Sequence, residues 1–229
     1  MSALERMRMQ QTQQDTTVAV AAPTIAIEPL QPAASGNRYC ASVAAMPALK
    51  PASFSVRPST GDDFLASKRV RIGQTNFDRD WRRVKSETVS NRAHLVAANA
   101  PVASESFVGA INRWVNRNVA YVEDRELFGK PDYWAGARTT LRLGKGDCED
   151  YALTKMQLLA AAGIPQSDMF LTIARDTVRR VDHAVLVVKL QDRFVVLDNA
   201  TDELLDGAYN HDYAPVLSFS GDKSWIHGY

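Results

Sequence analysis

The chain has 229 residues, 45% of them hydrophobic, and a formal net charge of +1. This length suits one good-sized domain with an extension, and the apolar fraction is sufficient to fill a core. A near-neutral balance lacks the basic stripe that nucleic-acid binding requires, so we expect no nucleic-acid partner.

The first 52 residues differ in composition from the rest, being rich in glutamine at 10–14 and then in alanine and proline. Such segments hold little fixed structure. We therefore predict a disordered extension over 1–52 and a folded domain over 53–229. A secretory signal needs an unbroken apolar stretch of ~7–15 residues, and Pro23 interrupts residues 17–27. No signal peptide is visible, and no run approaches the ~20 apolar residues of a transmembrane segment.

Two helices are expected in the first half of the domain. One is predicted over about 78–98, where Trp81 occupies an apolar position. The other is predicted from Ser104, because Phe107 and Ile111 recur at helical spacing. We interpret both helices as packing elements, with Trp81 and Trp114 as core anchors.

A cysteine, Cys148, lies between a glycine loop and a helix-forming run in the sequence GKGDCEDYA (144–152). Backbone N–H groups at a helix start carry partial positive charge, so they stabilise a thiolate and can hold the oxyanion of an attacked carbonyl. Asp147 is the expected N-cap, and the helix should end at Gly163. The other cysteine, Cys40, falls in the extension, and we interpret both as free thiols.

The segments on either side of this helix complete the predicted fold. Residues 124–140 mix glycine and proline with polar side chains, which predicts a long loop that lines an active site. Runs rich in valine and leucine at 169–174, 184–190 and 194–197 predict strands of an antiparallel sheet. The expected fold class is α+β, with N-terminal helices packed on the sheet and a nucleophile at a helix N-terminus.

His183 and Asp198 flank the hairpin formed by the last two of these strands. Because side chains alternate between faces, the pairing register decides whether the two can meet. If Lys189 pairs with Phe194, they share a face and lie within side-chain reach, whereas a shift of one residue separates them. In the first register His183 would take the thiol proton from Cys148, and Asp198 would fix the imidazole tautomer.

Simpler interpretations stand beside this one. A cysteine at a helix start is often a small buried residue, and a histidine at a strand edge is often only hydrogen-bonded. Asp198 could equally begin a turn. Among the other histidines, His211 ranks as the next candidate base, ahead of His94 and His227. The Trp134 indole N–H is a candidate second oxyanion donor, with ordinary packing as its alternative.

Three acidic residues, Asp147, Glu149 and Asp150, surround the cysteine. Nearby carboxylates disfavour formation of a thiolate. A calcium ion bound to their oxygens would cancel that penalty. Alternatively, these residues simply complement the positive end of the helix.

Several short motifs between about residues 54 and 225 resemble those of the bacterial transglutaminase-like cysteine proteinases of the LapG type. They are GDCEDYA at 146–152, HAVL at 183–186, LDN at 197–199, DYW at 132–134 and PVLSF at 215–219, with Trp225 near the end.

The resemblance implies a papain-like or transglutaminase-like α+β fold. It implies a catalytic triad of Cys148, His183 and Asp198. It also implies a calcium site beside the nucleophile, formed by Asp147, Glu149 and Asp150.

The same resemblance implies a periplasmic cysteine endopeptidase that clips a large surface adhesin and so releases biofilm cells, and that is sequestered by an inner-membrane receptor of cyclic-di-GMP. The chain departs from the family in lacking a visible export signal. Two other functions remain open, namely a transglutaminase-like acyl transferase, which forms the same thioester, and a catalytically silent peptide-binding module. The residues themselves do not specify the substrate, the cleavage sequence or the regulatory partner.

Overall fold

The structure is a computed structural model that describes residues 63–90 and 100–229. The predicted extension, Cys40 and His94 lie outside the described residues. The elements in chain order are β1 (Lys68–Ile72), α2 (Asp78–Val84), α4 (Glu105–Asn118), β2 (Ala120–Tyr121), α5 (Asp124–Leu127), α6 (Ala137–Leu143), β3 (Lys145–Gly146), α7 (Cys148–Ala161), the 3-10 helix η1 (Gln166–Asp168), β4 (Met169–Asp176), β5 (Asp182–Leu190), β6 (Arg193–Leu197), β7 (Leu205–Asp206), β8 (Tyr213–Ser220) and β9 (Lys223–Gly228).

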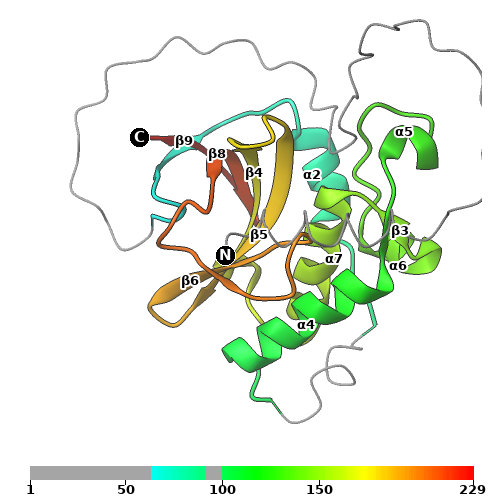
Figure 1. Cartoon of the computed structure of the whole chain (residues 1–229), viewed down its shortest axis with the longest axis horizontal. Helices are drawn as coiled ribbons and strands as arrows, with labels where there is room; N and C mark the ends of the chain where they lie inside the picture. Colours follow the sequence, from blue (N-terminus) through cyan, green and yellow to red (C-terminus); the bar gives the residue numbers. More distant parts are fainter. Residues whose placement is uncertain (1–62, 91–99) are drawn as a thin grey trace, which may run out of the picture. The chain divides into compact units, whose positions relative to one another are not determined.

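A seven-stranded sheet in the order β1-β9-β8-β4-β5-β6-β7 forms the centre of the domain, and each neighbouring pair is antiparallel. The helices gather on one side of it, with α7 against β5 (Figure 1). This arrangement confirms the α+β prediction. None of the helices in the described ranges is long and apolar enough to cross a membrane.

The helix predicted from Ser104 is confirmed as α4. The Ser104 hydroxyl accepts a hydrogen bond from the Phe107 backbone N–H at 3.2 Å, which satisfies one of the unpaired donors at the helix start. Phe107, Ile111 and Val115 are fully buried on one face of α4. Because these residues are four positions apart, they form one apolar face that packs α4 into the core.

The helix predicted after the cysteine is confirmed as α7, and almost all of its side chains are buried. It ends as expected, because Gly163 adopts a φ of 105° and Ile164 N–H donates to the Leu159 carbonyl at 3.1 Å. Asp147 occupies the N-cap position but makes no side-chain capping bond. Its carboxylate belongs instead to an acidic cluster described below.

Three expectations about the elements need correction. Of the helix predicted over 78–98, the first part ends at Val84 as α2, because the chain then turns so that the Glu87 carboxylate accepts the Arg138 backbone N–H at 3.1 Å, and residues 91–98 lie outside the described residues. The loop predicted over 124–140 contains α5 and the start of α6. The helices do not all precede the sheet, since β1 comes first and pairs with β9.

The hairpin of β5 and β6 has the register that the catalytic hypothesis requires. Lys189 pairs with Phe194, and the ladder continues to Leu186 opposite Leu197. Alternate residues of these strands divide between two cores. Leu186 and Leu197 belong to the cluster on the helix side of the sheet, and residues such as Val187 belong to a smaller cluster on the other side.

Candidate active site

The structure brings His183 and Asp198 together at one end of the β5–β6 hairpin. His183 Nε2 lies 2.9 Å from Asp198 Oδ1, and both side chains are buried. His183 is the second residue of β5, and Asp198 directly follows β6, so the register described above sets their approach. A carboxylate only accepts hydrogen bonds, so the Nε2 atom of a neutral His183 carries the hydrogen in this contact.

Asp198 is held as an anion by its surroundings. It accepts hydrogen bonds from His183, from the Tyr213 hydroxyl and from the Ala200 backbone N–H at 3.0 Å. Burial alone would raise the pKa of Asp198, but the His183 charge and these donors together lower it below its usual range. An ionised carboxylate that fixes one imidazole nitrogen leaves the other, Nδ1, for proton transfer.

Tyr213, from β8, was not among the residues singled out in the sequence. Its hydroxyl donates to Asp198, and its ring stacks on His183 with 5.3 Å between ring centroids. The local sequence does not predict this contact, because Tyr213 is 15 residues from Asp198. The two come together through the pairing of β8 with β4.

Cys148 begins α7, at the helix terminus predicted for it, and its side chain is 2% exposed. Its sulfur lies 3.3 Å from Glu149 Oε2. In the structure the Cys148 sulfur takes part in a disulfide bond, so our interpretation of this residue as a free thiol is wrong. Since only a thiolate is a nucleophile, any chemistry at Cys148 requires the reduced form.

In the proposed triad, the nucleophile Cys148 and the base His183 come from different sides of the sheet. Cys148 belongs to the cluster on the helix side, whereas Tyr213, which stacks on His183, belongs to the other cluster. They can approach only at the end of the sheet, where His183 lies near the start of β5. Direct contact between Cys148 and His183 stays a prediction.

The remaining described histidines are engaged elsewhere. His211, ranked second as a base, lies in the turn before β8, with Nε2 2.6 Å from the Asp206 carbonyl oxygen. His227 is buried between the hydroxyls of Ser67 and Ser218, each 2.7 Å from one ring nitrogen. Neither approaches Asp198 in the way that His183 does.

A cluster of buried acidic side chains lies next to Cys148. It consists of two sets of carboxylate oxygens, each set within 4.8 Å, that share Asp124: Asp124, Asp132 and Glu149, and Asp124, Asp147 and Asp150. The sequence singled out Asp147, Glu149 and Asp150, and the structure places them with Asp124 and Asp132, which the sequence analysis missed. The predicted loop at 124–140, which was expected to line the site, was the available signal for both.

The electrostatics of this cluster favour a cation. Burial, followed by repulsion from Asp147, raises the pKa of Asp124 to about 7. Burial also raises the pKa of Asp147 to about 6. It raises the pKa of Asp132 above its usual value as well. Burial and the Asp147 charge raise the pKa values of Glu149 and Asp150 well above their usual range. So many carboxylates in one buried place resist ionisation unless positive charge joins them.

The hydrogen bonds of the cluster point to the same conclusion. Three of its buried oxygens, Asp124 Oδ1, Asp147 Oδ1 and Asp150 Oδ2, have no hydrogen-bond donor in the described part of the chain. Calcium prefers ligands of this kind, namely several carboxylate oxygens. The donor set therefore fits a calcium ion.

The remaining oxygens of the cluster hold the preceding loop. Asp124 Oδ2 accepts from the Tyr133 backbone N–H, and Asp150 Oδ1 accepts from the Ala135 N–H at 2.8 Å. Gly146 permits this packing, because a Cβ there would lie 2.6 Å from Asp150 Oδ2. The acidic cluster thus fixes the backbone on both sides of Trp134.

Trp134 itself is 3% exposed. Its ring stacks on Phe77 with 5.4 Å between centroids and meets the edge of Phe219 at 5.8 Å. These contacts agree with the packing interpretation of Trp134. Its role as a second oxyanion donor stays a prediction.

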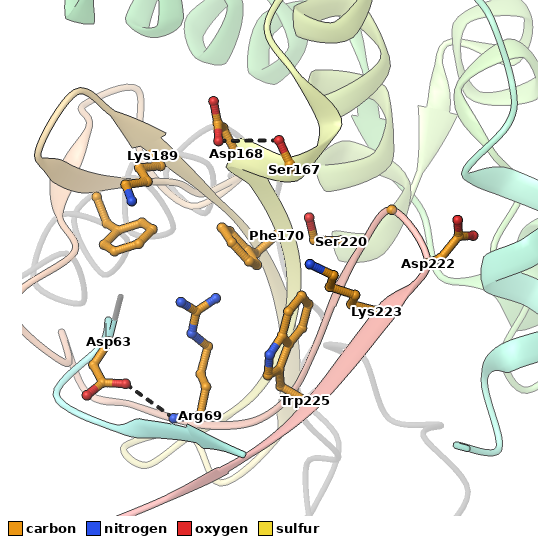
Figure 2. A pocket seen from close by; sticks show the side chains of 12 residues that line it. Asp63, Arg69, Ser167, Asp168, Phe170, Lys189, Ser220, Asp222, Lys223 and Trp225 are labelled. Atoms are coloured by element: carbon orange, nitrogen blue, oxygen red, sulfur yellow. Dashed lines mark hydrogen bonds between the residues drawn. The ribbon is translucent and has the colours of Figure 1, made fainter. Parts of the chain in front are cut away.

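A hollow of about 540 Å³ lies at the other side of the sheet (Figure 2). In it the Arg69 guanidinium lies over the rings of Phe170 and Trp225, 4.5 and 5.4 Å from their centroids. Its lining includes neither Cys148 nor any residue of the acidic cluster. This hollow is therefore separate from the residues of the proposed active site.

Comparison with known proteins agrees with the geometry described above. The sequence model of the family described as bacterial transglutaminase-like cysteine proteinase BTLCP matches residues 71–226, which is more than half of the chain. No curated protein matches the sequence.

Solved structures of Legionella pneumophila LapG have a similar fold. The calcium-bound form is 23% identical, with a TM-score of 0.50, and the match covers 66% of this chain and 88% of that one. The EGTA-treated form is 22% identical, also with a TM-score of 0.50, and the match covers 63% and 89%. At this identity the likeness concerns the fold.

Proposed function

The chain belongs to the bacterial transglutaminase-like cysteine proteinases and is a cysteine peptidase, and from this premise we propose that it is an endopeptidase with Cys148 as nucleophile, His183 as base and Asp198 as orienting acid. The observation that carries the proposal is the buried 2.9 Å contact between His183 Nε2 and Asp198 Oδ1. It lies on a hairpin whose first strand packs against the helix that Cys148 begins.

Each group has a defined task in this reaction. His183 Nδ1 takes the thiol proton, and the Cys148 thiolate attacks the carbonyl carbon of the peptide bond. Backbone N–H groups at the start of α7 stabilise the oxyanion. The C–N bond then breaks, His183 returns the proton to the leaving amine, and water hydrolyses the thioester. Asp198 stabilises the imidazolium throughout.

The nucleophile and the base can be tested without knowing the substrate. Cys40→Ser leaves Cys148 as the chain's one thiol, and the reduced variant is treated with iodoacetamide at pH 7. Alkylation should be rapid, and adding His183→Gln should slow it by about 10-fold or more, because the proton acceptor is lost. Equal rates with and without His183 would contradict the assignment of the base.

Cleavage itself is tested on a protein with an alanine-rich linker. The reduced enzyme should cut it, and Cys148→Ala should not. Mass spectrometry of the products then separates hydrolysis from transamidation, because only transamidation yields crosslinked peptides. Unchanged cleavage by Cys148→Ala would reject the proposed nucleophile.

Calcium is proposed as the resident cation of the acidic cluster. The unsatisfied oxygens of Asp124, Asp147 and Asp150 support this, and a related LapG has been solved in a calcium-bound form. Glu149 and Asp132 would complete the ligand set. The bound ion would supply positive charge that offsets the carboxylates around the nucleophile.

The calcium proposal has a readout apart from activity. EGTA should lower the melting temperature by several degrees, since a ligand at 100 times its Kd stabilises by about 2.7 kcal/mol. Asp147→Asn should weaken this response. Asp222→Asn, at a fully exposed carboxylate paired with Lys85, is the matched control. An identical melting temperature in EGTA and in calcium would remove the metal from the mechanism.

The substrate and the place of action follow from the motif resemblance. It supports cleavage of a surface adhesin or another exported protein in the periplasm, under the control of an inner-membrane receptor of cyclic-di-GMP. Incubation with the organism's own surface proteins, followed by sequencing of new N-termini, tests the substrate. Cell fractionation tests the compartment, and recovery of the protein from the cytoplasm alone would contradict it.

A further inference from the structure

The hollow shown in Figure 2 is not used by the proposed mechanism. Its volume of about 540 Å³ lies within the ~300–1,000 Å³ that is typical of ligand-binding pockets. Three basic side chains line it, namely Arg69 from β1, Lys189 from β5 and Lys223 from β9. They share the hollow with the rings of Phe170 and Trp225. A cavity with this lining suits a ligand that carries negative charge.

Aromatic rings hold the Arg69 guanidinium in place at the hollow. Its Cζ atom lies 4.7 Å from the ring centroid of Phe64, 4.5 Å from that of Phe170 and 5.4 Å from that of Trp225. Phe64 and Phe170 are buried members of the smaller core cluster, so Arg69 rests on a closely packed surface. Stacking engages the face of a guanidinium rather than its N–H edge, and that edge matches the geometry of a carboxylate. Arg69 is therefore preorganised to bind a planar anion.

Lys189 reaches the same place from a distant strand of the sheet. β1 and β5 have three strands between them in the strand order. Even so, Lys189 Nζ lies 5.9 Å and Arg69 Cζ lies 5.8 Å from the centroid of the Phe194 ring. Figure 2 shows Lys223 beside Trp225, directed into the hollow. Cations contributed by three strands match several carboxylates in succession better than a single one.

The carboxylates in the lining are directed away from these cationic groups. Asp222 is fully exposed and forms an ion pair with Lys85. Asp63 Oδ1 accepts a hydrogen bond from the Arg69 backbone N–H at 3.4 Å. In Figure 2 the side chains of Asp168 and Asp222 point away from the Arg69 guanidinium. The positive groups thus face the hollow, and the negative groups lie at its rim.

We propose that this hollow binds an acidic segment of a polypeptide, with Arg69, Lys189 and Lys223 holding successive carboxylates. The source of the segment rests on the proposed function, under which it belongs to the protein substrate and lies apart from the peptide bond that is cut. The hollow then acts as an exosite, meaning a substrate-binding site separate from the catalytic residues. Because the two sites engage one chain, binding at the exosite raises the effective concentration of the scissile bond at the nucleophile.

Binding is measured apart from catalysis in the Cys148→Ala variant, with a fluorescein-labelled peptide of five glutamates as the probe. Fluorescence anisotropy in reducing buffer at low salt should show binding of this peptide. The matching peptide of five glutamines should bind about 10-fold more weakly or less, because it lacks the charges that the hollow recognises. If the basic side chains only keep this face of the sheet soluble, the two peptides bind alike, and that result overturns the proposal.

Two substitutions locate the site. Arg69→Gln should weaken binding of the glutamate peptide by about 10-fold, because a guanidinium–carboxylate pair is lost. Lys223→Gln, at an exposed position, should weaken it by about threefold. Arg142→Gln is the control, because it removes the same charge from an exposed residue of α6 that does not line the hollow. An unchanged Kd in both Arg69→Gln and Lys223→Gln, or an equal loss in Arg142→Gln, overturns the proposal. Because Lys223 is exposed, this test holds even where Arg69→Gln lowers stability.

Cleavage tests the role of the hollow as an exosite. Two protein substrates share an alanine-rich linker and differ in five glutamates or five glutamines, placed before or after it at a distance of about 15 residues, which span about 50 Å when extended. The reduced wild type should cut the glutamate substrate with a KM about fivefold lower, and Lys223→Gln should reduce this difference. Equal KM values, with cleavage still abolished by Cys148→Ala, overturn the exosite and leave the proposed function intact. If neither substrate is cut while the glutamate peptide still binds, the proposed function fails and the binding site stands.

Discussion

The buried imidazole of His227 should make the stability of this protein depend on pH. Its two ring nitrogens each lie 2.7 Å from a serine hydroxyl, of Ser67 and Ser218, in the layer where β1, β9 and β8 meet. Burial, assisted by the positive charge of Arg69, lowers the pKa of His227 from 6.5 to about 3. The folded protein therefore keeps this imidazole neutral at a pH where the unfolded chain protonates it.

The sign and size of the effect follow from linkage. Stability is complete above the unfolded pKa of 6.5 and falls as the pH drops toward 3, because only the unfolded state takes up the proton. Each unit below 6.5 costs about 1.4 kcal/mol, so His227 alone should remove about 2 kcal/mol between pH 8 and pH 5. For a domain of this size, this corresponds to a fall in melting temperature of about 4–8 °C.

The assay compares urea unfolding of the wild type and His227→Gln at pH 8 and pH 5, with calcium present throughout. At pH 8 the variant should be less stable by about 1–2 kcal/mol, because buried hydroxyls lose a partner. Between pH 8 and pH 5 it should lose about 2 kcal/mol less than the wild type. Cys148 alkylation at pH 8 should be unaffected, because His227 is not the base. If the free energies of unfolding of wild type and variant differed by the same amount at pH 8 and at pH 5, the reasoning would be refuted.

Three further substitutions test individual contacts. Asp198→Asn should slow iodoacetamide alkylation at pH 7 by 10-fold or more, because the imidazolium loses its charged partner, and a wild-type rate would contradict this. Tyr213→Phe should lower the free energy of unfolding by about 1–3 kcal/mol, measured in urea, since a buried anion loses a donor. Gly146→Ala should abolish the melting-temperature response to calcium, because its Cβ would lie 2.6 Å from Asp150 Oδ2; a full response would show that Asp150 can move without affecting the ion.

The parts of the fold that depend on local pattern could be predicted. The helix after Cys148 follows from its periodicity and from Gly163 at its end, and the β5–β6 hairpin follows from two valine-rich runs, although the sequence left two registers open. Once Lys189 pairs with Phe194, the approach of His183 to Asp198 is a matter of counting residues.

The parts that depend on distant contacts could not be predicted. Tyr213 reaches Asp198 only because β8 pairs with β4 across the sheet, and Asp124 joins Asp147 only because the segment with α5 folds back on the start of α7. The early end of the helix predicted from residue 78 has the same cause. Its local sequence favours a helix, but the contact of Glu87 with α6 requires the chain to leave the helical path after Val84.

The carboxylates of this protein show how one residue type serves two different tasks. Asp198 accepts three hydrogen bonds, and its pKa is lowered despite complete burial. Asp124 and Asp147 each keep a buried oxygen without a donor, and burial raises their pKa values to about 7 and about 6. Burial is common to both groups, so the neighbours decide the difference: the His183 charge and the hydrogen-bond donors lower the pKa of Asp198, whereas nearby carboxylates raise the pKa values of Asp124 and Asp147. A carboxylate saturated with donors can stabilise an imidazolium, whereas a cluster short of donors remains strained until a cation binds.

Chelation should therefore act on the cluster and leave the contact between Asp198 and His183 in place, so that EGTA lowers the melting temperature of wild type and Asp198→Asn by similar amounts. A much smaller fall in Asp198→Asn would show that the two groups of carboxylates are coupled.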